Sequence, residues 1–356
     1  MKVMDGKRRP VLITGGAGFI GSNLADRLAG EGHDVLIYDA LVRPGVEANL
    51  AWLRLRHPGR IAFVIADLRD RAALEHAAAR ASAVFHLAAQ VAVTTSLADP
   101  EQDFDVNLRS TLFLLEALRR QPVPPPLVFA STNKVYGNLV DIPLERNGEA
   151  YLPQDPTLRA HGIDEDRSLS FYTPDGCSKG AADQYVLDYA RGFGLPACVL
   201  RMSCIYGPRQ LGTEDQGWLA HFLYSVRAGR PISIYGDGRQ VRDVLYVDDA
   251  VDAYVAAWAR IGQVSGQAFN LGGGAVNAIT LLQVLQEIAA ITGRPADLRY
   301  SDWRPGDQRY FVADTRRAAL ALGLRPAIGW RDGLRRLAGW IDGERPLREP
   351  AVAAGA

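Results

Sequence analysis

A glycine-rich turn near the start of the chain has the spacing of a phosphate-binding loop. Residues 11–14 are an apolar run typical of a buried strand, and glycines at intervals of three residues follow it before a segment with helical spacing. Glycines let the backbone approach a pyrophosphate, which the positive end of a helix then stabilises. The residues predicted to contact such a cofactor are Gly15, Gly18, Phe19, Ile20 and Gly21.

Asp39 indicates which dinucleotide the turn would hold. It ends the second apolar run, at the distance from the glycines where an acidic residue binds the hydroxyl groups of an adenosine ribose. A carboxylate there would repel the 2′-phosphate of NADP, so NAD is the predicted cofactor. Arg43 keeps NADP open as an alternative, and a plain turn residue is the other interpretation of Asp39.

Asp175 and Lys179 lie one helical turn apart at the start of a predicted helix over residues 174–194. Asp175 is either a first-turn acidic residue that stabilises the positive helix end after Pro174 or a base that accepts a hydroxyl proton. The second role needs burial, because the ordinary pKa of aspartate, about 3.9, is roughly three units below that of a base suited to neutral pH. Tyr172 and Tyr136 are further candidates for the base.

Alternating strands and helices must position these residues. The pattern predicts an α/β fold with a doubly wound, parallel Rossmann sheet and a smaller, discontinuous C-terminal substrate domain. Strands are predicted near residues 11–14, 35–39, 61–65, 83–88, 126–131 and 197–201, and helices near 19–31, 47–56, 71–80, 101–120 and 174–194. We expect the first domain over residues 1–202 with returns near 244–272, and the second over 203–243 and 273–345.

Composition excludes several other kinds of protein. The 356 residues include 40 basic and 40 acidic side chains, so net charge indicates neither a nucleic-acid nor a membrane partner. The three cysteines and six histidines lack metal-ligand spacing, and no metal is expected. The N-terminus lacks the pattern of a signal sequence, so a cytoplasmic enzyme is expected. The tail from residue 346 to 356 is expected to be frayed.

Further motifs, taken in order, resemble those of extended short-chain dehydrogenases/reductases, the NAD-dependent epimerase/dehydratase family. These enzymes share the glycine spacing found here. By the resemblance, Asp67 and Leu68 would contact adenine, Ala88 would lie beneath the cofactor, Asn107 would lie in a helix of the central fold, and Thr132 would be the catalytic hydroxyl.

Four segments resemble CDP-tyvelose (CDP-paratose) 2-epimerases in particular: residues 131–137, 177–185, 215–218 and 307–309. The resemblance implies an NAD-dependent nucleotide-sugar epimerase that transiently oxidises C2 of a CDP-hexose to a ketone. Lys179 would bind the cofactor ribose beside Thr132. The residues that would contact the nucleotide sugar are Gln90, Asn133, Lys134, Arg209, Gln216, Arg242, Arg304 and Arg309.

Asp175 departs from the family pattern, which has a catalytic tyrosine four residues before the lysine. The alternatives are therefore another nucleotide-sugar enzyme, such as a 4-epimerase or a dehydratase, or a non-redox protein that binds NAD and a nucleotide sugar. Dehydratases have Asp-Glu after the threonine, whereas this chain has Asn133-Lys134.

The resemblance also predicts a homodimer or a higher homo-oligomer. In the family, the helices that correspond to residues 101–120 and 174–194 pair across a four-helix bundle. The apolar residues expected to supply contact surface are Leu112, Leu114, Leu115, Leu118, Tyr185, Val186 and Tyr189.

Overall fold

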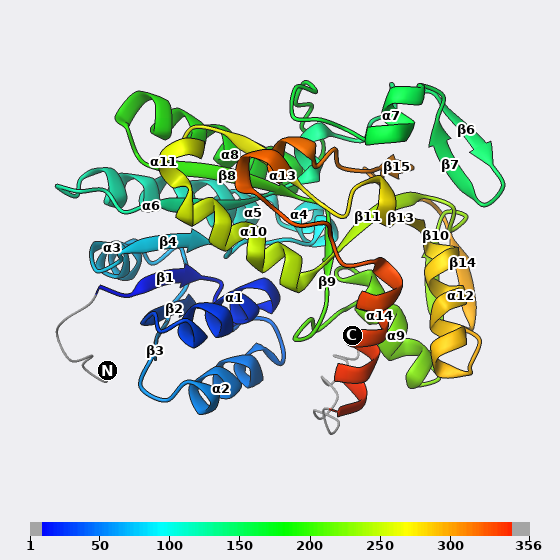
Figure 1. Cartoon of the computed structure of the whole chain (residues 1–356), viewed down its shortest axis with the longest axis horizontal. Helices are drawn as coiled ribbons and strands as arrows, with labels where there is room; N and C mark the ends of the chain where they lie inside the picture. Colours follow the sequence, from blue (N-terminus) through cyan, green and yellow to red (C-terminus); the bar gives the residue numbers. More distant parts are fainter. Residues whose placement is uncertain (1–8, 344–356) are drawn as a thin grey trace.

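A seven-stranded parallel sheet forms the centre of the larger part of the molecule (Figure 1). The computed structural model describes residues 9–343. The strand order of this sheet is β12-β8-β5-β4-β1-β2-β3. Successive strands are therefore added outwards in one direction from β1 to β3 and in the opposite direction from β4 to β12, and the switch point lies between β1 and β4. Doubly wound sheets bind ligands outside the strand ends at such a point. The strands are β1 (Val11–Thr14), β2 (Val35–Asp39), β3 (Ile61–Ile65), β4 (Ala83–His86), β5 (Leu127–Thr132), β8 (Ala197–Met202) and β12 (Ala268–Leu271).

Helices cover both faces of this sheet, and the alternation along β1 shows how. Val11 and Ile13 point into one apolar core, whereas Leu12 points into the other. The helices of the first core are α1 (Phe19–Gly30), α2 (Val46–Arg56), α10 (Val247–Ala259) and α13 (Arg316–Leu322). The helices of the second core are α3 (Arg71–Ala79), α6 (Ser110–Arg119) and α8 (Thr173–Phe193). The predicted doubly wound parallel fold is confirmed.

The helix predicted near residues 101–120 is divided into three. It consists of α5 (Pro100–Phe104), a π-helical turn η1 (Asp105–Arg109) and α6, and it follows the short helix α4 (Val93–Ala98). The apolar periodicity on either side continues through the turn, which is why the sequence predicted a single helix. The π turn lies beside α8 and near the switch point, and such turns are frequent at functional sites.

Five of the apolar residues expected at a subunit interface lie instead in the core. Leu114, Leu115, Leu118 and Val186 are completely buried against the sheet, and Tyr189 is buried beside them. Helical periodicity shows that one face of a helix is apolar, but it does not show whether that face meets the sheet or a second subunit.

The smaller part of the molecule combines two small sheets with three helices. Strands β9 (Cys204–Tyr206), β11 (Val241–Tyr246), β13 (Ala278–Thr280) and β15 (Tyr310–Phe311) form one sheet, and β10 (Ile232–Tyr235) pairs with β14 (Leu298–Ser301). The helices of its apolar core are α9 (Trp218–Arg227), α12 (Leu281–Thr292) and α14 (Trp330–Gly343). The remaining elements are η2 (Asn133–Tyr136), the β6 (Leu144–Asn147) and β7 (Ala150–Pro153) hairpin, α7 (Pro156–His161), α11 (Ile261–Val264) and η3 (Ala275–Asn277).

The return to the central sheet differs in one strand from the prediction. The segment near 244–272 was expected to return as a whole, but β11 pairs with β9, β13 and β15 in the smaller sheet. The helices α10 and α11 and the strand β12 return. All six residues of β11 are buried, a pattern equally typical of a central Rossmann strand. The helix α13 also packs on the larger part, through Ala318 and Leu322.

The sequence indicates no membrane partner, and the structure bears on this prediction only over the described residues. None of the helices within residues 9–343 has the length and apolar character needed to cross a membrane. The tail predicted to be frayed, residues 346–356, lies outside the described residues.

Candidate active site

The glycine turn has the backbone geometry of a dinucleotide cradle. Gly15 has a φ of +71°, and a Cβ atom on it would lie 2.7 Å from the backbone nitrogen of Ala88. A Cβ atom on Gly21 would collide with the carbonyl oxygen of Gly15. Gly18 is the N-cap of α1 and has no side chain, so the first-turn N–H groups of the helix have no capping acceptor. Glycine is therefore required at Gly15 and Gly21, and this turn fits the pyrophosphate of NAD.

Asp39 is held at the end of β2 by two backbone groups. Its Oδ2 accepts the N–H of Ala17 at 3.0 Å, and its Oδ1 accepts that of Leu41 at 2.9 Å. These bonds orient the carboxylate beside the glycine turn, where its remaining lone pairs can accept ribose hydroxyls. At the end of β3, Asp67 pairs with Arg69 at 2.8 Å, and Leu68 is buried in the second core.

Removal of the Asp39 carboxylate should change the choice of cofactor. Asp39→Ala should weaken NAD binding about tenfold or more, because two charge-assisted hydrogen bonds to the ribose are lost. NADP binding should change much less, since the repulsion of its phosphate is lost at the same time. Titration calorimetry with both dinucleotides measures the ratio, and an unchanged ratio would show that the adenosine ribose lies elsewhere.

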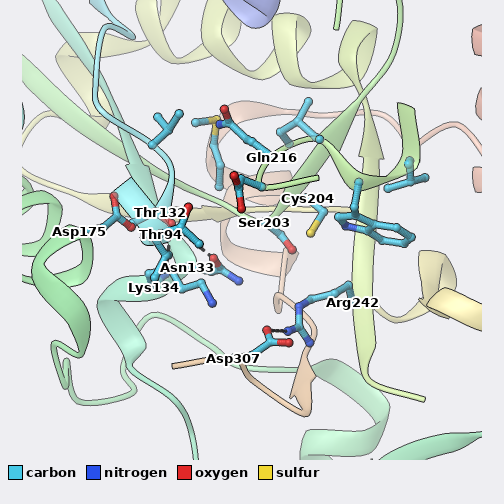
Figure 2. Close-up of a pocket in the computed structure, with 18 of the residues that line it drawn as sticks. Thr94, Thr132, Asn133, Lys134, Asp175, Ser203, Cys204, Gln216, Arg242 and Asp307 are labelled. Atoms are coloured by element: carbon cyan, nitrogen blue, oxygen red, sulfur yellow. Dashed lines mark hydrogen bonds and ion pairs between the residues drawn. The ribbon is translucent and has the colours of Figure 1, made fainter. Parts of the chain in front are cut away.

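A cavity of about 440 Å³ opens between the strand ends and the smaller part of the molecule. Phe19 and Ile20 from the glycine turn line its cofactor side. It brings together most of the residues predicted for the sugar and its chemistry, namely Thr132, Asn133, Lys134, Asp175, Lys179, Gln216, Arg242 and Arg304. Figure 2 shows Asp175 and Thr132 on one side of the cavity and Arg242 on the other.

The Asp175 side of the cavity combines a hydroxyl, a carboxylate and an ammonium group. Thr132 ends β5, and Asp175 and Lys179 lie in the first two turns of α8. The ammonium of Lys179 donates to the carbonyl oxygen of Ala130 at 2.6 Å, which holds it beneath the end of β5. Within residues 9–343, no hydrogen bond to the Asp175 carboxylate is found, although only 5% of the residue is exposed.

Burial changes the acidity of both charged groups. It raises the pKa of Asp175 to about 6, against the opposing effect of the Lys179 charge. It also lowers the pKa of Lys179 to about 8. An ionised carboxylate and a charged ammonium therefore coexist between about pH 6 and pH 8. The interpretation of Asp175 as a base required a raised pKa, and burial in this fold provides it. A carboxylate with this pKa can accept a proton near neutrality.

The Arg242 side of the cavity is rich in cations. The guanidinium of Arg242, on β11, binds the carboxylate of Asp307 at 2.6 Å, and Lys134 donates to the carbonyl of Gly306 at 3.3 Å (Figure 2). Arg304 stacks 3.8 Å above the ring of Tyr235. Lys134, Arg242 and Arg304 line this side together with three carboxylates, those of Asp307, Glu214 and Asp215, with which the two arginines pair. Guanidinium groups of this kind can bind a diphosphate.

Three predicted substrate residues do not line the cavity. Gln90 donates to Asp103 at 3.0 Å, below the site. The guanidinium of Arg209 lies 3.8 Å from the ring of Trp52, between the two parts of the molecule. Arg309 stacks on Trp303 and Tyr151. Their positions in the sequence next to motif residues did not reveal the direction of their side chains.

The two tyrosines considered as alternative bases also lie outside the cavity lining. Tyr136 is almost fully buried, donates to Asn270 at 2.8 Å and accepts from Arg201 at 3.1 Å. Burial raises the pKa of Tyr136 to about 12. Tyr172 precedes α8 and is half exposed. Neither tyrosine therefore joins Asp175 and Thr132 on the cavity wall.

Sequence reasoning did not assign several residues that the fold brings to the site. Asp307 was quoted only as part of a motif, although it binds Arg242. Ser203 and Cys204 line the cavity between the two sides, and burial raises the pKa of the Cys204 thiol. The spacing of these residues carries no signal, because they come from different strands and loops. No cluster of three or more metal-ligating side chains occurs among the described residues.

The fold and this site define an NAD-dependent enzyme of the short-chain dehydrogenase/reductase type. Residues 11–272 match the model of the NAD dependent epimerase/dehydratase family, and the chain belongs to this family. It is similar to CDP-paratose 2-epimerase of Salmonella typhi, with 40% identity over 91% of this chain and 96% of the relative. It is also 33% identical to the UDP-glucose 4-epimerase of Mycolicibacterium smegmatis, over 91% of this chain and 95% of the relative.

Solved structures agree with this assignment. A UDP-glucose 4-epimerase of Thermotoga maritima, crystallised with UDP-glucose, has a TM-score of 0.80 and 31% identity, covering 94% of this chain and 98% of that one. The Thermus thermophilus UDP-glucose 4-epimerase in complex with NAD has a TM-score of 0.79 and 32% identity, covering 94% of this chain and 100% of that one. The predicted family, fold, enzyme class and NAD cofactor are confirmed.

Proposed function

We propose that the chain epimerises C2 of a CDP-linked hexose, with Asp175 as the base. The observation that carries this proposal is the buried carboxylate of Asp175, which lines the cavity with Thr132 and whose pKa burial raises to about 6. The similarity to a CDP-paratose 2-epimerase supports the choice of nucleotide and carbon. Asp175 stands where the family has tyrosine, so the chemistry is the same and the proton acceptor differs.

The reaction divides between the two sides of the cavity. The glycine turn and Asp39 would hold NAD, which would supply the hydride acceptor and donor for C2. Asp175 takes the proton of the C2 hydroxyl as that hydride leaves, and Thr132 donates a hydrogen bond to the oxygen as it becomes a ketone. Lys179 contacts the end of β5 and would bind the cofactor ribose there. After the sugar turns over, Asp175 returns the same proton, so no proton is gained or lost.

Turnover of the sugar requires that the rest of the substrate stays bound. Arg242, Lys134 and Arg304 hold the diphosphate, while the sugar rotates about its phosphate link. Gln216 and the aromatic ring of Trp218, which also line the cavity, contact the nucleotide end. The ketone would therefore stay beside Asp175 and Thr132 with its other face open to the hydride that bound NAD would supply.

Isotope transfer tests this route directly. The purified protein is incubated with CDP-, UDP-, dTDP- and GDP-hexoses, and the products are resolved by NMR. With a C2-deuterated CDP-hexose in ordinary water, the C2 epimer should form and should retain its deuterium, because hydride returns from the same cofactor. Loss of the label to water would contradict the redox route, and the absence of any product would leave a non-redox binding protein.

The same experiment separates the other family activities. Elimination of water would produce a 4-keto-6-deoxy sugar, but Asn133 and Lys134 follow Thr132 here, and neither is a carboxylic acid that could protonate the leaving hydroxyl. A 4-epimerase would change the configuration at C4 and leave C2 intact. NMR distinguishes all three products.

A homodimer is the proposed assembly. The helices α4, α5 and α8 each bury some residues but leave large apolar side chains exposed to solvent. These side chains are Leu97, Phe104, Tyr185 and Phe193. Burial of this face against a second copy would remove apolar surface from water. Light scattering at micromolar concentration should show a dimer, and Tyr185→Glu should shift it towards monomer. A monomeric wild-type protein would contradict the proposal.

A further inference from the structure

A second buried carboxylate lies beneath the active site. Asp103, in α5, has no exposed surface, and three side chains donate hydrogen bonds to it. Gln90 Nε2 donates at 3.0 Å, Asn107 Nδ2 donates at 3.1 Å, and the hydroxyl of Ser178 also donates. These donors come from the segment after β4, from the π-helical turn and from α8.

The network fixes the start of α8 against the strand end below the cofactor. The two N–H groups of the Asn107 amide are shared among Asp103, the Gln90 carbonyl at 3.0 Å and the Ser178 hydroxyl at 3.1 Å, and the Gln90 N–H donates to the Asn107 amide oxygen at 2.8 Å. Ser178 lies between Asp175 and Lys179 on α8 and precedes Lys179 directly. The π turn places Asn107 where it can contact all of these groups, so the irregular backbone here allows the hydrogen-bond network to form.

The charges around Asp175 give this network a second consequence. Lys179 on the same helix and Lys134 on η2 both favour the ionised carboxylate, and Asp103 is the acidic group that opposes them. Burial raises the pKa of Asp103, whereas its three donors favour the ionised form. On the far side of Lys179, Asp183 contributes negative charge, and His86 is neutral because burial lowers its pKa to about 3.

We propose that Asp103 is a positioning residue of this active site. It holds the start of α8 through Ser178, whose hydroxyl lies 3.3 Å from the Asp175 carbonyl oxygen, and its negative charge opposes the effect of the two lysines on Asp175. The inference rests on the proposed role of Asp175 as the base. A lysine beside a tyrosine lowers a high pKa towards neutrality, but an aspartate begins below neutrality and needs the opposite influence. Asp103, together with burial, supplies that influence.

The test is a titration of Asp175 followed by ¹³C-carboxyl NMR in the full-length protein. Asp103→Asn keeps the shape of the side chain and removes its charge. The midpoint of the Asp175 titration should fall by about one pH unit, the shift that a unit charge about 12 Å away produces at an effective dielectric constant of about 20. With a nucleotide sugar that the wild type turns over, the acidic limb of the rate profile should fall by the same amount.

Asp105→Asn is the matched control. Asp105 lies two residues further along, pairs with Arg109 at 3.1 Å and is partly exposed, so its removal should leave the titration and turnover unchanged. Ser178→Ala keeps the Asp103 carboxyl group but removes its hydroxyl bond to α8. It should move the titration midpoint less than Asp103→Asn does and lower turnover about tenfold, the scale set by one charge-assisted hydrogen bond.

The outcomes separate this inference from the proposed function. An unchanged Asp175 midpoint in folded Asp103→Asn overturns the charge role, and unchanged turnover in Ser178→Ala overturns the positioning role. If Asp103→Asn does not fold, Ser178→Ala decides. If the wild type epimerises no nucleotide sugar, the proposed function fails, yet the NMR titration still answers the electrostatic question.

Discussion

Asp175→Asn is expected to lower turnover at least about a hundredfold, the usual scale for the loss of a general base. The amide keeps the size of the side chain, so binding of NAD and of the nucleotide sugar should change little. Folding should be slightly favoured, because burial disfavours the charged carboxylate that the substitution removes. A helix-start acid with no catalytic role would behave differently, since its loss should leave turnover within a few-fold and lower the melting temperature.

The pH profile of the wild type provides an independent check. Asp175 must be ionised to accept a proton, so turnover should fall as pH drops below about 6. Lys179 must be charged, so turnover should fall again above about pH 8. Asp175→Asn should abolish the acidic limb. Asp175→Tyr rebuilds the tyrosine–lysine pair of the family, and if Asp175 has no catalytic role this variant should raise activity. Turnover insensitive to both substitutions would move the proton-accepting role to another residue.

Arg242→Met is expected to weaken the binding of CDP, and of a CDP-hexose, about tenfold to a hundredfold. Loss of a charge-assisted hydrogen bond costs about 1.5–3 kcal/mol, and 1.4 kcal/mol corresponds to a factor of ten in affinity. Methionine fills a similar length of the buried side chain without its charge. Calorimetry with CDP alone separates this effect from catalysis, and cytidine, which lacks the diphosphate, should bind both proteins equally.

Arg309→Met is the matched control for Arg242→Met. Arg309 also follows a motif residue, but its guanidinium stacks on Trp303 and Tyr151 outside the cavity. Its loss should therefore leave the affinity for CDP within about twofold, as expected for an exposed contact. Equal losses in the two variants would show that the effect is general electrostatic attraction and not a specific diphosphate contact.

The fold was predictable because it depends on patterns that repeat. Apolar runs such as that of β1 alternate with helices, and glycine spacing requires a particular backbone, so the doubly wound sheet and the cofactor turn followed from the sequence. Strand β11 did not, since a completely buried strand has the same pattern in either sheet. The π turn did not either, because one wider turn hardly disturbs apolar periodicity over twenty residues.

The site was predictable only where the backbone itself places the side chain. Thr132 and Asp175 follow from the end of a strand and the first turn of a helix, and both line the cavity. The direction of long side chains depends on partners from distant segments, as Arg209 and Gln90 show. The raised pKa of Asp175 also depends on burial by other elements, which spacing along one helix does not contain.

The loop that contains Arg209 lies between the glycine turn and the smaller part of the molecule and is hydrogen-bonded to residues near that turn. The amide of Asn49 donates to the carbonyls of Ala17, in the glycine turn, and of Arg209, and Asn23 donates to the carbonyl of Pro208. The Arg209 guanidinium lies near the rings of both Trp52 and Trp340. We therefore expect order imposed on the glycine turn by a dinucleotide to extend through these contacts to the first loop of the smaller sheet. By thermodynamic reciprocity, occupancy of either pocket should tighten the other, and a chain stripped of its dinucleotide should bind nucleotide sugars poorly.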